Sequence, residues 1–206
     1  MITVALPKGR IAKETLSIFE KIFNKEFKFG ERKLILEDKD FRFLLVRNQD
    51  VPTYVYHQAA DIGVVGLDVL EEQKLDLIRL LDLNIGKCSV CIGIKEEESL
   101  DFSKPTIKVA TKMVNIARDY FSKNAIPVEI IKLYGSIELA PLIGLADMIV
   151  DIVETGETMR QNGLKPALTI MESSAHLIAN KNSFFSKKDE ILSLYEKIEK
   201  EIKSES

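Results

Sequence analysis

Short strand-like segments alternate with helical patterns along most of this 206-residue chain, and this alternation constrains the fold more than any other feature. The strand-like segments are apolar and rich in β-branched residues. They lie at 2–6, 41–46, 61–66, 88–94, 106–110, 128–133 and 148–153. Between the first two, Ile11, Thr15, Ile18 and Ile22 form one face of a helix. Such alternation predicts an α/β protein with a mainly parallel sheet.

A short internal repeat predicts how the chain is divided. Residues 60–68 resemble residues 146–154, because each segment places Ala-Asp directly before an apolar strand. Chance is the alternative, since Ala-Asp is a common pair. The repeat indicates two similar α/β lobes with a ligand-binding cleft between them. We expect lobe I to contain 1–86 plus 176–206, and lobe II, with a phosphate-binding loop, to contain 87–175.

Composition excludes several classes of protein. Hydrophobic residues make up 46% and charged residues 30%, which is enough to build a core. A formal charge of −3 argues against a generally basic nucleic-acid-binding protein. The apolar runs are too short to span a membrane, and the first residues read as a strand and not as a signal peptide. We therefore expect a cytoplasmic protein that binds neither membrane nor nucleic acid.

The cysteines and histidines are too few for a disulfide scaffold or a multi-histidine metal centre. Cys88 and Cys91 form a Cys-x-x-Cys sequence within a strand pattern, where residues three apart face opposite sides. This placement argues against a redox or metal role. His57 is expected on a surface helix and His176 in a late helix.

The segment Asp151–Thr158 carries the strongest chemical signal. An apolar strand runs into Thr155-Gly156-Glu157-Thr158, and a helical pattern follows. Glycine lets the backbone approach a ligand, threonine hydroxyls donate hydrogen bonds, and a helix start favours an anion. Asp151 lies inside the apolar strand, where a carboxylate needs donors such as ribose hydroxyls. The pattern predicts a site for a sugar phosphate. The alternative is a plain strand–turn–helix in which Thr155 is a cap and Asp151 bonds to the backbone.

Cations follow several of the predicted strands. Lys8, Gly9 and Arg10 lie between the first strand and the first helix, a pattern that suits a diphosphate or triphosphate. Arg47 and Lys87 also lie at a strand end or crossover. An exposed basic turn is the alternative for each one taken alone.

Two acidic residues are weaker candidates. Asp68 follows the strand 61–66, where it could be a helix N-cap. Glu138 follows Ser136 in a similar layout and could face a ligand.

Several segments together resemble one known family, the ATP phosphoribosyltransferases, in their short catalytic-subunit form. They run in family order over nearly the whole chain: 5–10, 46–52, 60–68, 108–112, 135–141 and 144–164. Two departures from the family pattern, Asn48 and Tyr134, affect the expected nucleotide contacts but not the reaction class.

The resemblance implies a fold and a reaction. The fold is two-lobed, like type II periplasmic binding proteins, with the active site in a central cleft. The enzyme transfers the phosphoribosyl group of phosphoribosyl pyrophosphate to a ring nitrogen of ATP, with Mg²⁺ held mainly by substrate. Pyrophosphate is released, and this is the first step of histidine biosynthesis.

The resemblance also assigns residues and partners. Thr155, Gly156, Glu157 and Thr158 would bind the ribose 5-phosphate, and Asp151 the ribose hydroxyls. Lys8 and Arg10, as catalytic groups, and Gly9 would line the diphosphate and nucleotide side. The remaining substrate-binding candidates are Arg47, Asp68, Lys87 and Glu138. The expected partners are a second copy, as a dimer, and a regulatory subunit resembling histidyl-tRNA synthetase.

Three other functions are weighed against this one. A non-catalytic two-lobed small-molecule binding protein would not need the Thr-Gly-x-Thr turn behind an acid. A different phosphoribosyltransferase usually carries two adjacent acids in its loop, whereas Asp151 and Glu154 are separated here. A thiol oxidoreductase would depend on Cys88 and Cys91.

Overall fold

The computed structural model describes residues 1–205, with side chains through Ser204. By its internal contacts the chain divides into two compact units. Unit 1 contains Met1–Gly86 and the chain from Ser174 onward, and unit 2 contains Lys87–Ser173. The second boundary falls before Ser174, whereas we expected it before His176.

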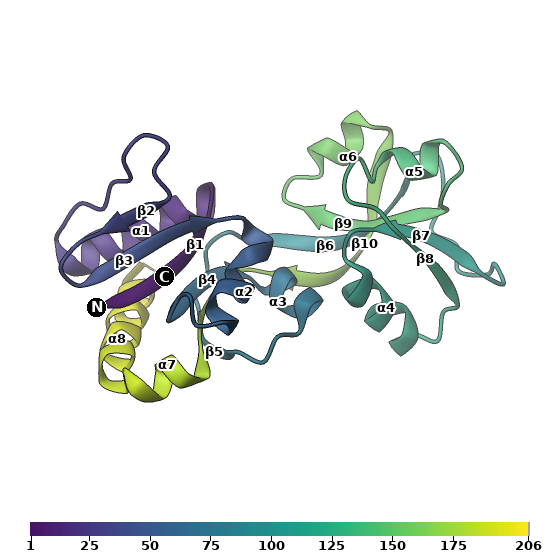
Figure 1. Ribbon diagram of the computed structural model, residues 1–206. Coiled ribbons are helices and arrows are strands. Elements are labelled where there is room, and N and C mark those ends of the chain that lie inside the picture. Colours follow the sequence, from purple (N-terminus) through teal and green to yellow (C-terminus); the bar gives the residue numbers. More distant parts are fainter. Residues whose placement is uncertain (206) are drawn as a thin grey trace. The chain divides into compact units, whose positions relative to one another are not determined.

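Unit 1 is a six-stranded sheet with helices on both faces (Figure 1). Its strands follow the order β2-β3-β1-β4-β11-β5. The strands are β1 (Ile2–Pro7), β2 (Ile35–Glu37), β3 (Phe41–Val46), β4 (Ile62–Gly66), β5 (Ile78–Asp82) and β11 (Ala175–Ala179). The helices are α1 (Arg10–Phe23), the short 3-10 helix η1 (Asn48–Asp50), α2 (Val51–Tyr56), α3 (Leu67–Gln73), α7 (Lys181–Ser186) and α8 (Lys188–Glu205).

Unit 2 is a five-stranded sheet in the order β10-β6-β9-β7-β8. Its strands are β6 (Cys88–Lys95), β7 (Ile107–Thr111), β8 (Val128–Lys132), β9 (Met148–Val153) and β10 (Leu164–Ser173). Its helices are α4 (Val114–Lys123), α5 (Leu139–Leu142) and α6 (Glu157–Gln161).

Both units contain the same arrangement of three parallel strands. β1 lies between β3 and β4 in unit 1, and β7 lies between β8 and β9 in unit 2. On the other side of β4 and β9 the neighbouring strands, β11 and β6, run antiparallel to them. The sheets are therefore mixed, which corrects the prediction of a mainly parallel sheet.

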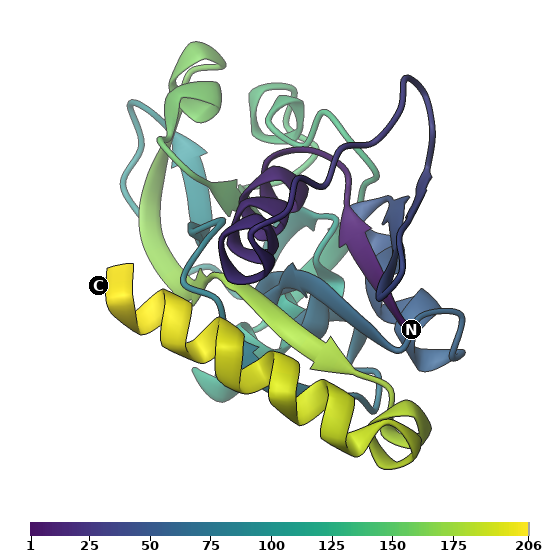
Figure 2. The ribbon, with the colours of Figure 1, turned by 90° about the vertical axis from the view of Figure 1, so that its left-hand side faces the viewer.

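Buried side chains cover both faces of each sheet. In unit 1, α1 and α8 pack together on one face, and Figure 2 shows α8 running past α1 there. The other face is covered by α2 and α3. In unit 2, α4 packs on one face, and α5 and α6 cover the other. Because side chains alternate along a strand, each strand residue can be assigned to one of these faces.

The repeated Ala-Asp segments occupy matching places in the two sheets. Asp61 accepts a hydrogen bond from the Thr3 N–H at 2.8 Å, and its own N–H donates to the Thr3 carbonyl at 2.9 Å. Asp147 makes the same two bonds with Lys108, at 2.8 Å each. Each aspartate thus ties the start of one parallel strand to its neighbour, and the repeat seen in the sequence has a structural basis.

A lysine completes each of these aspartate sites. Lys187 Nζ lies 2.7 Å from Asp61 Oδ2, and Lys104 Nζ lies 2.5 Å from Asp147 Oδ1. The Asp61 side chain is only 10% exposed, whereas the Asp147 side chain is 29% exposed. Burial by itself raises the pKa of Asp61, but the bonds from Lys187 and the Thr3 N–H outweigh it and lower that pKa below 3.8.

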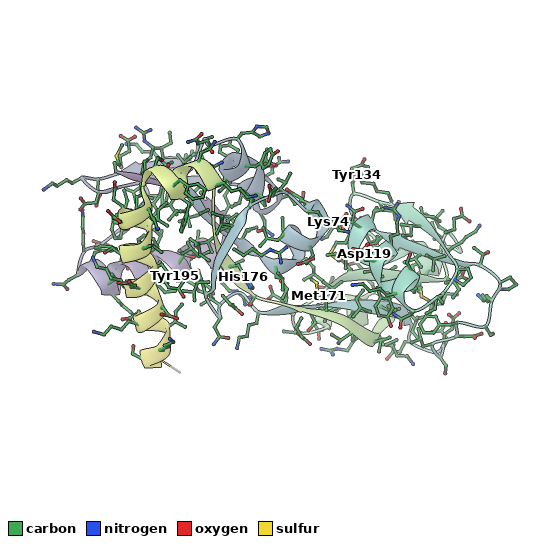
Figure 3. The ribbon with its side chains drawn as sticks, turned by 90° about the horizontal axis from the view of Figure 1, so that it is seen from below. Lys74, Asp119, Tyr134, Met171, His176 and Tyr195 are labelled. Carbon is green, nitrogen blue, oxygen red and sulfur yellow. The ribbon has the colours of Figure 1, made fainter. Side chains whose placement is uncertain are left out.

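One expected helix is a strand. His176 lies in β11, paired with β4 and β5, and not in a late helix (Figure 3). Cys88 and Cys91 do lie in a strand, β6, as expected. Cys91 is buried, and its Sγ lies 3.5 Å from Thr169 Oγ1. No helix in residues 1–205 combines the length and the apolar character needed to cross a membrane.

Removing the Lys187 charge should destabilise unit 1. Lys187→Met leaves a nearly buried Asp61 carboxylate without its cation, at a cost of about 1–2 kcal/mol after allowing for the partly exposed lysine. The melting temperature at pH 7 should fall by several degrees. Because the folded-state pKa of Asp61 is lowered, this stabilisation is present above pH 3.8 and is lost as pH falls through the folded value. The difference between the two proteins should therefore shrink in acid. A melting temperature unchanged at pH 7 would contradict the assignment.

Candidate active site

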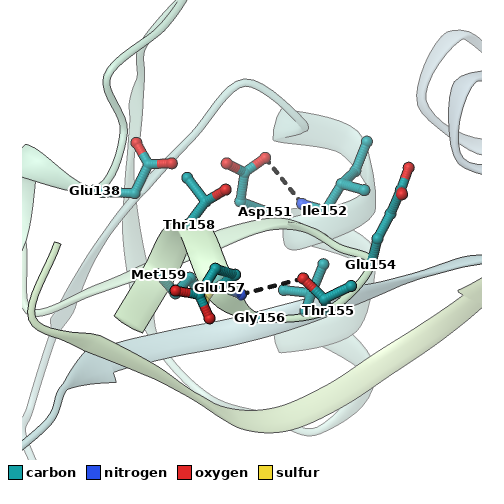
Figure 4. Close-up of a pocket in the computed structure, with 10 residues that line it drawn as sticks. Glu138, Asp151, Ile152, Glu154, Thr155, Gly156, Glu157, Thr158 and Met159 are labelled. Atoms are coloured by element: carbon teal, nitrogen blue, oxygen red, sulfur yellow. Dashed lines mark hydrogen bonds between the residues drawn. The ribbon is translucent and has the colours of Figure 1, made fainter. Parts of the chain in front are cut away.

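A pocket of about 320 Å³ lies at the carboxyl end of β9 (Figure 4). It is formed entirely by unit 2. Its lining includes six of the residues proposed from the sequence: Glu138, Asp151, Thr155, Gly156, Glu157 and Thr158. The other lining residues are Ile152, Val153, Glu154 and Met159. The structure therefore brings half of the predicted site residues into one cavity.

The alternation of β9 explains why Asp151 reaches this pocket. Ile149 and Val153 pack with residues of α5 and α6, whereas Met148 and Val150 pack on the α4 side. Asp151 shares the face of Ile149 and Val153. Its carboxylate therefore lies on the α5 and α6 side, next to the segment that follows β9.

Asp151 has two partners in the structure, and both contact the same oxygen. Oδ1 accepts a hydrogen bond from the Ile152 N–H at 2.8 Å and lies 3.4 Å from Lys112 Nζ. In Figure 4 the other oxygen points away from Ile152. The Asp151 side chain is 14% exposed. The carboxylate is thus anchored through one oxygen, and the second oxygen is available to accept from a ligand.

The turn after β9 depends on Gly156. Its φ of 76° and ψ of 0° place it in the left-handed region, where glycine is favoured, and it is the N-cap of the five-residue helix α6. Thr155 Oγ1 accepts a long hydrogen bond, 3.4 Å, from the Glu157 N–H. Thr155 is therefore not the helix cap that the alternative interpretation expected, because Gly156 holds that position, and the bond leaves the hydroxyl hydrogen available to a ligand.

Arg160 stabilises this turn through two hydrogen bonds. Its guanidinium donates to the Thr155 carbonyl at 3.2 Å and to Glu157 Oε2 at 2.9 Å. Gln161 donates to the other Glu157 oxygen at 3.0 Å. These two donors lower the pKa of Glu157 below 4.5. Glu157 is therefore ionised at neutral pH and serves to brace the turn.

The pocket lining combines hydroxyl donors with carboxylates. Four of the lining residues are acidic: Glu138, Asp151, Glu154 and Glu157. Arg160 pairs with Glu157, and Lys112 pairs with Asp151. A negatively charged ligand bound here must therefore bring a cation or depend on these two basic residues.

The other candidates lie mostly in unit 1, at one edge of its sheet. Lys8, Gly9 and Arg10 follow β1, and the Lys8 N–H donates to the Val46 carbonyl at 2.9 Å. Arg47 follows β3 directly. Because β1 and β3 are parallel neighbours, their carboxyl ends lie at the same end of the sheet. The three cations that follow these strands therefore lie at that end. Arg10 also pairs with Glu14, at 3.6 Å.

Asp68 lies at the same end of this sheet as the three cations, because β4 is parallel to β1, whereas Lys87 belongs to unit 2. Asp68 lies in the first turn of α3, directly after β4, and is 5% exposed. Lys87 precedes β6 in unit 2. β6 pairs with β9 so that Ser89 lies opposite Val153. Lys87 lies beyond the end of this pairing and does not line the pocket.

Sequence reasoning missed Lys112 and Glu154 as site residues. Lys112 follows β7, the strand next to β9, and Thr111 lies opposite Val150. Its position directly before the N-cap of α4 is that of Lys8 before the N-cap of α1. This shared place after the first strand of each repeat was the available signal.

Replacing Gly156 should strain the turn. A Cβ there meets its neighbours at 3.4 Å or more, so space is not the obstacle, but a left-handed φ costs a non-glycine residue about 1–2 kcal/mol. Gly156→Ala should therefore lower the melting temperature by a few degrees. Gly135→Ala is the matched control, because Gly135 has nothing within 4 Å of its added Cβ and no positive φ. Equal melting temperatures for the two variants would refute this account.

Comparison with known proteins identifies the family. The family model described as ATP phosphoribosyltransferase matches residues 47–200. An ATP phosphoribosyltransferase of Nitratiruptor sp. is 76% identical over 200 residues, which cover 97% of this chain and 98% of the relative. A chain of the ATP phosphoribosyl transferase (HisG:HisZ) complex from Thermotoga maritima is 32% identical, with a TM-score of 0.84, over 99% of this chain and 100% of that one.

A more distant structure shares the fold alone. The periplasmic aliphatic sulphonate binding protein SsuA from Escherichia coli has a TM-score of 0.63 at 10% identity, over 98% of this chain and 68% of that one. The predicted periplasmic-binding-protein-like α/β fold is thereby confirmed, and the cleft between the units stays a prediction. The chain belongs to the ATP phosphoribosyltransferase family, the pentosyltransferases that transfer a phosphoribosyl group to ATP in the first step of histidine biosynthesis.

Proposed function

We propose that the pocket at the end of β9 binds the phosphoribosyl part of phosphoribosyl pyrophosphate. One observation carries this proposal: Asp151, Thr155 and Thr158 line one cavity around the left-handed Gly156. Hydroxyl donors suit a phosphate, and a carboxylate acceptor suits the ribose hydroxyls. The alternatives weighed from the sequence lose their support once the family is known.

Each group has a distinct task in this proposal. The Thr155 and Thr158 hydroxyls donate to the 5-phosphate, and Gly156 lets the phosphate approach the backbone. The second carboxylate oxygen of Asp151, Oδ2, accepts hydrogen bonds from the ribose hydroxyls and so fixes the orientation of the sugar ring. Glu138, which lies on the same pocket wall, is placed to bind the sugar or the incoming nucleotide.

The reaction needs alignment more than acid–base chemistry. A ring nitrogen of ATP uses its lone pair to form a bond to the anomeric carbon, and the bond from that carbon to pyrophosphate breaks with its electrons leaving on oxygen. The attacking nitrogen is neutral, so no strong general base is required. Holding the sugar at a fixed angle and neutralising the leaving group supply most of the rate enhancement.

The cations of unit 1 take the nucleotide and diphosphate side in this proposal. Lys8 and Arg10 are exposed and follow β1, and Arg47 follows the neighbouring strand. Gly9 lies between two of them with a φ of 109° and nothing within 4 Å of an added Cβ, so a phosphate can approach its backbone. Lys87 and Asp68 are secondary candidates for the same substrates.

Mg²⁺ would enter with the diphosphate. This ion prefers oxygen ligands and keeps several waters. Among the side chains of residues 1–204, no three acidic, histidine or cysteine groups are placed together as a metal site. Most ligands of Mg²⁺ would therefore be substrate oxygens and water. The ion would neutralise the negative charge of the departing pyrophosphate.

Loss of the Asp151 charge or the Thr158 hydroxyl should impair use of phosphoribosyl pyrophosphate. For Asp151→Asn and for Thr158→Val, kcat/KM for that substrate should fall about 10- to 100-fold, because each loses a hydrogen bond to the sugar phosphate. The KM for ATP should change little. Formation of phosphoribosyl-ATP can be followed by absorbance.

The matched control for Asp151→Asn is Asp101→Asn, at an exposed aspartate of unit 2 away from the pocket. It should leave the kinetics unchanged, and all variants should keep the melting temperature within a few degrees. Normal kinetics for both Asp151→Asn and Thr158→Val would remove the pocket assignment.

We also propose that the chain works in the cytoplasm as a dimer, within a hetero-oligomer containing a regulatory subunit that resembles histidyl-tRNA synthetase. The similarity to a chain of the HisG:HisZ complex supports this partner. Mixing the chain with such a subunit, ATP, phosphoribosyl pyrophosphate and Mg²⁺ should give a larger particle by light scattering and faster phosphoribosyl-ATP formation. Unchanged mass and rate on mixing would reject the partner.

A further inference from the structure

We propose that Lys112 is a positioning residue for phosphoribosyl pyrophosphate, acting through the Asp151 carboxylate. This inference rests on the proposed function of the pocket and adds a residue that neither the motif nor the pocket lining includes. Lys112 Nζ lies 3.4 Å from Asp151 Oδ1.

The register of the sheet places this lysine. β7 and β9 are parallel neighbours, with Thr111 opposite Val150, so Lys112 follows β7 where Asp151 lies on β9. Ala110 packs on the α5 and α6 side of the sheet, and by alternation Lys112 shares that side. Thr111 Oγ1 also donates to the Val150 carbonyl at 2.6 Å, which fixes the end of β7 against β9.

The contact orients the carboxylate. Oδ1 is held by both Lys112 and the Ile152 N–H, so rotation of the carboxylate would break two contacts. The second oxygen is then presented to the pocket as an acceptor (Figure 4). Without Lys112, one backbone bond remains, and the carboxylate can turn away from the position that a ribose hydroxyl needs.

The contact between Lys112 and Asp151 also reduces the net negative charge beside the pocket. The pocket is lined by four carboxylates, and the substrate itself carries several negative charges. Lys112 offsets the charge of Asp151, whose side chain is 14% exposed, whereas the side chain of Glu157, the other paired acid of the pocket, is 56% exposed. Loss of this lysine should weaken substrate binding more than the chemical step, since it acts before the bond to pyrophosphate breaks.

The test compares Lys112→Met with Lys104→Met. The two lysines lie near opposite ends of β7, each pairs with an aspartate of unit 2, and each substitution removes one positive charge. Lys112→Met should raise the KM for phosphoribosyl pyrophosphate about five- to tenfold, with kcat changed less than about twofold and the KM for ATP unchanged. Lys112→Arg should recover most of the affinity, and Lys104→Met should leave the KM for phosphoribosyl pyrophosphate and kcat unchanged.

A double-mutant cycle tests whether Lys112 acts through Asp151. Lys112→Met, Asp151→Asn and their combination are compared by calorimetric titration of the full chain with phosphoribosyl pyrophosphate and Mg²⁺. Adding Lys112→Met to Asp151→Asn should have little further effect. Additive effects would overturn the positioning role.

The two proposals fail in different ways. Impaired binding in Asp151→Asn with unchanged binding in Lys112→Met overturns only the role of Lys112. Unchanged binding in Asp151→Asn overturns the pocket assignment and this inference with it. Lys112→Gln serves as a second variant if Lys112→Met loses its folded circular dichroism spectrum, and the same effect on KM is expected.

Discussion

Two aspartates fix the parallel strands from which both halves of the chain are built. Asp61 and Asp147 each exchange two hydrogen bonds with one residue at the start of the neighbouring strand. A slip of one residue would turn every side chain of a strand to the opposite face. These paired bonds therefore decide which side chains reach the carboxyl edge of each sheet. Asp151 faces the pocket, four residues after Asp147, because this register holds.

β4 and β9 could be predicted from the sequence because most of their residues are apolar and many are fully buried. β3 and β9 were predicted with their observed bounds, 41–46 and 148–153. β2, β5 and β10 consist mostly of exposed and partly buried residues and were not predicted, although β8, which has the same burial pattern as β5, was. His176 was expected in a late helix, whereas its segment forms β11. Its pairing with β4 and β5 decides its conformation.

In the candidate site too, contacts within one stretch of sequence could be predicted, whereas a contact between distant segments could not. Residues 151–158 are consecutive, so their shared pocket could be predicted from a single stretch of chain. The contact between Lys112 and Asp151 joins two strands that are neighbours in space but separated by α4, β8 and α5 in the sequence. Pattern reasoning predicted that the in-strand acid needs donors. Only the order of strands in the sheet identifies one of those donors as a lysine.

The two repeats differ at the place where one of them forms the pocket. In unit 1, β4 ends at Gly66 and α3 begins at Leu67, so strand and helix are continuous and Asp68 is buried in the first helical turn. In unit 2, Glu154, Thr155 and Gly156 separate β9 from α6. These residues provide the left-handed turn, a threonine hydroxyl and space for a ligand. The end of the strand thus has the same place in both units, and the three residues that follow β9 form part of the pocket wall.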